Sequence, residues 1–386
     1  MKKIVFGAGF FLIILCLFPQ ELSHVVSVIN IEIPTRVFKG DKFIDHLTIN
    51  DFEVYEDGQP QPIEAVYLIK KADIKREEGK KEIKPRLSRL FIFLFEMTEY
   101  LPETDKAMDY FIDQVILPDD SFEVVTPVKT YRMKSDVFDI IPKETVKKQL
   151  KEILRRDIVM GGSEYRNLLR DVRASLEEGN LNDYRMYLEQ LETLRKLDQK
   201  KMIAFAEELK KQDGQKNVFL FYQQEVLPQL APDARARMML SGDPQSALEQ
   251  MELLDSYTRD VRFDVGAIQK AFSDASVSIN FIFITKTQMT GRDVTNMNPS
   301  WNIVMVEKSE DFFSAFREIA RATGGLSTSS ANAASAFKTA VDASENYYLI
   351  YYRPQNYKAD GKFHELKVKV KSGNYNVIHR AGYIAR

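Results

Sequence analysis

Short, predominantly apolar runs are the feature that most constrains how this chain of 386 residues can fold. They lie at 87–95, 122–126, 216–222, 277–285 and 346–352. Each has the length of a strand, and a run that is mostly apolar, without polar residues at every second position, is typical of a strand buried on both faces. Between the first two runs, apolar residues recur with helical spacing at Ala107, Met108, Phe111, Ile112, Val115 and Ile116. The alternation predicts an α/β fold, in which helices flank a mostly parallel sheet.

The chain divides into a central region and two strand-rich ends. We expect the α/β region to span residues 86–353 and to contain a helical insertion at 143–215. Residues 25–70 alternate between polar and apolar side chains around an Asp57-Gly58 turn, and residues 354–386 alternate in the same way. We expect these ends to pack together as a small antiparallel β unit. The mixed charges of residues 71–85 predict a solvated linker.

The insertion allows two interpretations. Its apolar stripes favour a hairpin of two antiparallel helices that pack on each other or on the sheet. However, the second helical run, at 182–212, is longer than most helices in globular proteins. The alternative is therefore a projecting coiled-coil arm that binds a partner.

Charge and the N-terminal residues bear on partners and location. The 54 basic and 56 acidic side chains leave a formal charge of -2, so we do not expect nucleic acid as a partner. Residues 1–24 contain two lysines and an apolar run, the layout of a signal peptide or N-terminal anchor. We expect an exported protein that is periplasmic, secreted or associated with the cell envelope. Membrane contact would come only from this segment, if it is not cleaved. The single cysteine, Cys16, lies inside this run.

Several motifs together resemble those of the bacterial VWFA-related domain proteins, and they are spread over most of the chain. They are found at 47–63, 87–95, 322–325, 347–354, 362–371 and 380–383. The resemblance implies a von Willebrand A-like (Rossmann-like) domain. It also implies a role in protein binding.

The resemblance also bears on metal binding. A metal-ion-dependent adhesion site of that family holds Mg²⁺ with oxygen ligands from three loops. The corresponding positions here are Glu96, Thr98, Tyr100, Ser163 and Gln223. Glutamate is longer than the usual aspartate, tyrosine cannot place its oxygen where serine does, and glutamine removes a negative charge. The implied site is degenerate. We expect no cofactor, with Mg²⁺ binding as the alternative, and Glu96, Thr98, Ser163 and Gln223 remain candidate ligand-binding residues in a hydrogen-bonded loop cluster.

Catalytic motifs do not emerge from the sequence. The four histidines, His24, His46, His364 and His379, show no metal or triad spacing, and we expect them at the surface. No nucleophile elbow or phosphate-binding loop is present. We therefore expect a non-enzymatic protein–protein interaction module. The alternatives are a Mg²⁺-dependent adhesion module and an uncharacterised hydrolase. We expect the tyrosines of 347–352 to pack in the core.

Overall fold

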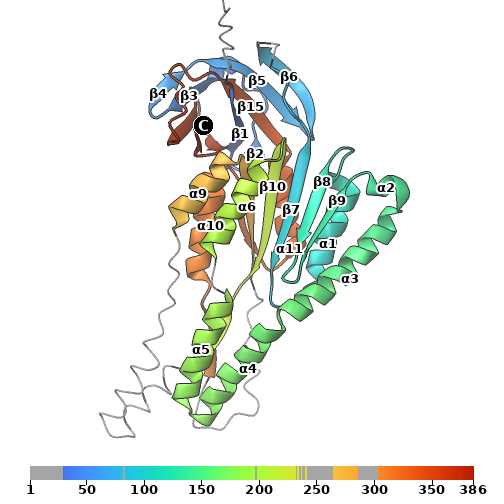
Figure 1. Ribbon diagram of the computed structural model, residues 1–386, viewed down its shortest axis with the longest axis vertical. Coiled ribbons are helices and arrows are strands. Elements are labelled where there is room, and N and C mark those ends of the chain that lie inside the picture. The colour runs from blue at the N-terminus through green and yellow to red at the C-terminus, as the bar shows by residue number, and fades with distance from the viewer. Residues whose placement is uncertain are drawn as a thin grey trace, which may run out of the picture.

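The computed structural model describes residues 29–80, 83–195, 198–231, 264–285 and 303–386, together with the isolated positions 233, 236 and 240. The molecule is elongated, with a β-sandwich at one end, an α/β body in the middle and a helical arm at the other end (Figure 1). The predicted signal peptide or anchor at residues 1–24 lies outside the described residues. Among the helices that are described, none is long and apolar enough to cross a bilayer.

The body is built on a six-stranded sheet in the order β14-β12-β10-β7-β8-β9. Its strands are β7 (Arg89–Glu96), β8 (Ser121–Val125), β9 (Thr130–Lys134), β10 (Gln215–Gln223), β12 (Val277–Ile284) and β14 (Ser327–Ser330). Neighbours are parallel from β14 to β8, whereas β9 is antiparallel to β8. The sheet is therefore mixed.

Helices cover both faces of this sheet (Figure 1). One face packs against α1 (Pro102–Tyr110), the π-helical turn η2 (Phe111–Val115), α3 (Lys143–Gly161) and α11 (Ala333–Ser344). The other packs against α6 (Gln199–Lys210), α9 (Val265–Asp274) and α10 (Glu310–Ala322). Buried phenylalanines such as Phe93 and Phe281 fill the two layers, which explains why the central strands β7, β10 and β12 are mostly apolar.

The β-sandwich combines both ends of the described chain. Its larger sheet contains β1 (Ile31–Lys39), β2 (Lys42–Phe43), β5 (Ile63–Lys70), β6 (Asp73–Gly79), β15 (Asn346–Tyr352) and β17 (Asn376–His379). Its smaller sheet contains β3 (Phe52–Glu56), β4 (Gln59–Gln61), β16 (Phe363–Val370) and β18 (Gly382–Ile384), and the short helix η1 (Ile49–Asp51) precedes β3. The pairing of β1 with β17 and of β3 with β16 joins residues far apart in sequence.

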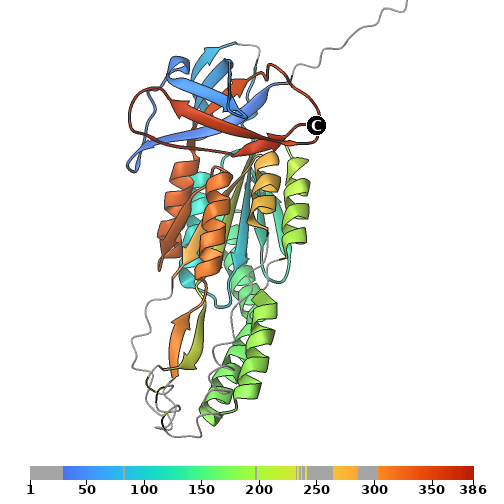
Figure 2. The same ribbon diagram turned by 90° about the vertical axis from the view of Figure 1, so that its left-hand side faces the viewer.

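The arm projects from the end of the body that lies opposite the sandwich (Figure 2). We define it as α4 (Ser163–Glu178), α5 (Leu181–Arg195) and the antiparallel ribbon of β11 (Val226–Leu230) and β13 (Ile303–Glu307). A short helix, α2 (Val137–Ile140), precedes α3. The arm has its own core, which includes Tyr165, Val172, Leu188 and Leu230. Gly179 ends α4 in the left-handed conformation that glycine adopts readily.

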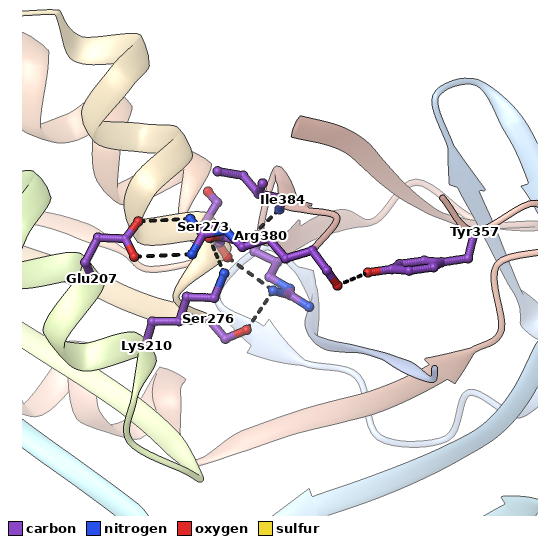
Figure 3. Close-up of polar contacts among 9 residues, drawn as sticks. Glu207, Lys210, Ser273, Ser276, Tyr357, Arg380 and Ile384 are labelled. Carbon is purple, nitrogen blue, oxygen red and sulfur yellow. Dashed lines mark hydrogen bonds and ion pairs between the residues drawn. The ribbon is translucent and has the colours of Figure 1, made fainter. Parts of the chain in front are cut away.

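The C-terminal residues tie the sandwich to the body (Figure 3). Asp274 at the end of α9 accepts a hydrogen bond from the backbone nitrogen of Ile384 at 2.7 Å and pairs with Lys210 of α6. Arg386 pairs with Glu207 of α6 at 3.1 Å, and Arg380 donates to the Ser276 hydroxyl at 2.6 Å. These contacts hold β18 against two helices of the body.

The predicted fold class, a von Willebrand A-like, mostly parallel sheet, is wrong. Three of the four described sheets are antiparallel, and the fourth is mixed. One cause is the short turn between β8 and β9, since only a longer crossover could make these strands parallel. A second is β15, which we placed in the α/β core but which pairs antiparallel with β1 and β5.

Three further expectations meet different outcomes. The stretch predicted as a linker contains the edge strand β6, whose charged side chains are exposed except for the half-buried Arg76 and Glu78. The long run at 182–212 contains two helices, α5 and α6, and α6 packs on the sheet rather than in the arm. Core packing of Tyr347, Tyr348, Tyr351 and Tyr352 is confirmed, because all four are buried.

Candidate functional site

The candidate residues lie at the carboxyl edge of the body sheet, where the arm begins. Strands β7 and β10 run parallel, with Glu96 opposite Tyr222, so the loop after β7 and the last residue of β10 meet at this edge. The opposite edge faces the sandwich, since Gln215 at the start of β10 bonds Glu32 of β1 at 2.8 Å. The topology therefore places the candidate site beside the arm and away from the sandwich.

The side chain of Gln223 links the end of β10 to the loop after β7. Its side chain is only 2% exposed, and its Oε1 accepts from the backbone nitrogens of Thr98 at 3.1 Å and Glu99 at 3.0 Å. The Thr98 hydroxyl lies 3.3 Å from the same oxygen, and the Gln223 Nε2 lies 3.4 Å from the Glu99 carboxylate. The amide thus satisfies loop donors and reaches one acceptor. This dual role suits glutamine, because a carboxylate could not donate to Glu99.

The loop between α3 and α4 approaches the same place through its backbone. A Cβ atom at Gly162 would lie 2.3 Å from the Thr98 carbonyl oxygen, so only glycine fits. Arg166 donates one guanidinium nitrogen to that Thr98 carbonyl and another to the carbonyl of Val159 at 2.6 Å. A positive charge therefore lies beside the loop after β7, where it would repel a divalent cation.

The other predicted site residues are used differently. Glu96 is exposed at the end of β7. The Tyr100 hydroxyl donates to Asp105 of α1, and burial together with this bond raises the pKa of Tyr100. The Ser163 hydroxyl donates to the carbonyl of Met160 at 2.6 Å. The structure thus joins Thr98 and Gln223 directly, while Tyr100 and Ser163 bond within their own segments.

A buried ion pair beside this edge was missed by sequence reasoning. Arg195, the last residue of α5, pairs with Glu225 at 2.5 Å, and Glu225 also accepts from the Tyr222 hydroxyl at 2.8 Å. The guanidinium lies over the rings of Tyr222 at 4.8 Å and Tyr165 at 5.7 Å. This group ties the base of the arm to β10. The two charges are 30 positions apart and belong to no motif, so the sequence offered no signal for them.

Two histidines are not simple surface residues, contrary to our expectation. His364 is 18% exposed and contacts acidic side chains, and His379 bonds the backbone of Val368. His364 contacts Asp57, which is 307 positions away in sequence. His379 lies on β17, whereas its partner Val368 lies on β16 of the other sheet. No spacing rule could have found them.

Comparisons with protein-family models, with curated proteins and with solved structures find no match to this chain. The resemblance to the bacterial VWFA-related domain proteins therefore stays a prediction from the sequence motifs.

Proposed function

We propose that this chain is an exported, non-enzymatic protein-interaction module and that the arm is its recognition element. The observation that carries the proposal is the position of exposed apolar side chains. Of the ten large apolar side chains that are exposed among the described residues, six lie in the arm or at the end of α3 beside it, and they are 38–57% exposed: Val159, Met160, Met186, Leu194, Val304 and Met305. Exposed apolar side chains that gather in one part of a protein mark interaction surfaces more often than scattered ones do.

The arm does not need these side chains for its own packing. Leucines and tyrosines of α4, α5 and β11 already form a buried cluster. The exposed methionines are also suited to contact, because their flexible, polarisable side chains adapt to a partner surface. An arm that is already folded around its own core has less conformational entropy to lose when it binds.

The edge of the sheet supports recognition without Mg²⁺. The Gln223 amide oxygen accepts from the loop after β7. The positively charged guanidinium of Arg166 donates to the Thr98 carbonyl. Both features oppose an ion that prefers several oxygen ligands in octahedral geometry. The proposed export rests on the pattern of residues 1–24.

Capture experiments with matched charge substitutions test the proposal. The full chain, immobilised, would be exposed to solubilised cell-envelope extract of its source and compared with M186D/L194D and with I74D. Ile74 is a suitable control, because it is 37% exposed and lies on β6 of the sandwich. We expect one set of proteins to be retained by wild type and I74D and lost from M186D/L194D. Retention that is equal in all three, or lost only in I74D, would contradict recognition by the arm.

A further inference from the structure

A second cluster of polar groups lies in the sandwich, at the opposite end of the molecule from the arm. Glu56 ends β3, Asp57 begins the turn to β4, and His364 lies on β16. Asp57 and His364 are 307 positions apart in sequence. They meet because β3 and β16 are antiparallel neighbours.

The distances suit a metal ion. His364 Nδ1 lies 2.7 Å from Asp57 Oδ2 and 3.7 Å from Glu56 Oε1, and one possible ligand atom from each of the three residues lies within 4.8 Å of the others. Tetrahedral coordination with bonds near 2.1 Å places ligand atoms about 3.4 Å apart. Small side-chain adjustments would therefore convert the observed cluster into a coordination shell.

Neighbouring groups hold these side chains in position. His364 Nε2 lies 3.4 Å from Asp360 Oδ1, and the Tyr352 hydroxyl donates to Glu56 Oε2 at 2.5 Å. Asp57 Oδ1 accepts from the backbone nitrogen of Glu365 at 2.8 Å. A carboxylate on the far nitrogen of a histidine, with hydrogen-bonded acidic neighbours, is the arrangement that commonly orients metal ligands.

The charges in this cluster are unbalanced. Glu56, Asp57 and Asp360 each lie within 4.0 Å of His364, and among the described residues no lysine or arginine pairs with any of them. Three carboxylates thus surround one imidazole. A divalent cation would offset the repulsion between them.

Tyr383 provides independent support. It is 5% exposed, and its buried hydroxyl makes no hydrogen bond with any residue that the structure describes. Tyr383 stands opposite His364 in the pairing of β16 and β18, and the two rings stack with centroids 5.6 Å apart. The stacked rings place Tyr383 beside the cluster. A buried hydroxyl of this kind needs a hydrogen-bond partner, and a metal-bound water would donate to its oxygen.

We propose that Glu56, Asp57 and His364 bind one divalent transition-metal ion of the Zn²⁺ class, with a bound water facing Tyr383. The imidazole nitrogen favours such an ion over Mg²⁺ and Ca²⁺, which prefer oxygen ligands. The ion would lock the β3–β4 turn to β16 and β18, and so fasten the two ends of the described chain together. Its role is structural and separate from the recognition proposed for the arm.

Isothermal titration of the metal-stripped full chain with zinc chloride tests this site. We expect one tight equivalent in the wild type, and at least tenfold weaker binding in H364N and D57N. His46→Asn is the matched control, because His46 is exposed outside the cluster, and we expect its zinc affinity to equal that of the wild type. Wild-type zinc binding that is absent, or that is no tighter than in H364N and D57N, would overturn the proposal.

A milder variant keeps the test decisive if H364N does not fold. Asp360→Asn leaves the three proposed ligands in place and removes the negative charge beside His364 Nε2, while an amide oxygen can still accept from the backbone nitrogen of Lys362. We expect zinc binding to weaken about 10–100-fold in a variant that circular dichroism shows to be folded. Zinc affinities that are equal in the wild type, D57N and D360N would exclude this site.

Discussion

The side-chain oxygen of Gln223 lies 3.0 Å from the backbone nitrogen of Glu99 and joins the end of β10 to the loop after β7. The same oxygen accepts from the backbone nitrogen of Thr98 at 3.1 Å. One amide therefore organises a loop that would otherwise hold two unsatisfied backbone donors. These bonds hold the loop after β7 against the end of β10, at the edge of the sheet where the arm begins.

Replacing Gln223 with alanine tests this role. In the variant, the backbone N–H groups of Thr98 and Glu99 lose their acceptor. We therefore expect the free energy of unfolding to fall by about 2–3 kcal/mol. Urea denaturation measures this loss. Gln212→Ala is the control, because Gln212 is exposed and lies just after α6, and we expect a loss of less than about 0.5 kcal/mol there. Equal effects in both variants would show that the Gln223 contacts contribute little.

Restoring a carboxylate at this position should not create a Mg²⁺ site. In Gln223→Asp, the bond to the Glu99 carboxylate is lost, the two acids repel each other, and the Arg166 cation stays on the Thr98 carbonyl. We expect calorimetry to detect no tighter Mg²⁺ binding than in the wild type. Tighter Mg²⁺ binding by Gln223→Asp than by the wild type would refute this.

Gly162 should tolerate no side chain. A methyl group there would overlap the Thr98 carbonyl oxygen, which is a backbone atom and cannot move aside alone. We expect Gly162→Ala to lower the free energy of unfolding by about 1–3 kcal/mol. In Gly266→Ala the nearest atom to the new methyl is an Asp264 side-chain oxygen at 3.2 Å, so the expected change is smaller. A larger loss at Gly266 than at Gly162 would contradict the close approach.

Stability should depend on the protonation of His379. Its Nε2 accepts from the backbone nitrogen of Val368 at 3.1 Å and its Nδ1 donates to the carbonyl of Arg380 at 2.8 Å, so the folded state holds the neutral ring. Burial, with smaller effects from Arg380 and Lys367, lowers the pKa of His379 below its ordinary value of 6.5. The unfolded chain therefore binds this proton more readily, and stability falls as pH drops below about 6.5.

Chemical denaturation between pH 7.5 and pH 5 would measure this effect. We expect the wild type to lose more stability over the interval than His379→Gln, which has no proton to gain. The difference between the two isolates His379 from other titrating groups. An identical pH dependence would mean that protonation of His379 does not affect folding.

The sequence predicted individual strands better than their partners. Apolar runs located β7, β8, β10, β12 and β15 to within a few residues. However, a run such as that of β15 indicates burial on both faces and not the sheet that provides it. Its tyrosines alternate between two clusters of the sandwich, which only the long-range pairing with β1 and β5 reveals.

The site shows the same limit. Positions 98 and 223 could be selected as oxygen-bearing residues at strand ends, but not the direction in which Tyr100 or Ser163 would bond. Asp57 was interpreted only as a turn residue, and His364 as a surface residue. Their contact depends on the register of β3 against β16, which no local pattern encodes.

Site-specific photo-crosslinking in the source cells tests the central claim, recognition through the arm, most directly. The photoreactive residue benzoylphenylalanine would replace Met186 on α5 in one chain and Ile74 on β6 in the other, at positions of similar exposure. We expect a discrete crosslinked protein from position 186 and none from position 74. A discrete product from position 74 with none from position 186 would place the interaction surface on the sandwich and contradict the account.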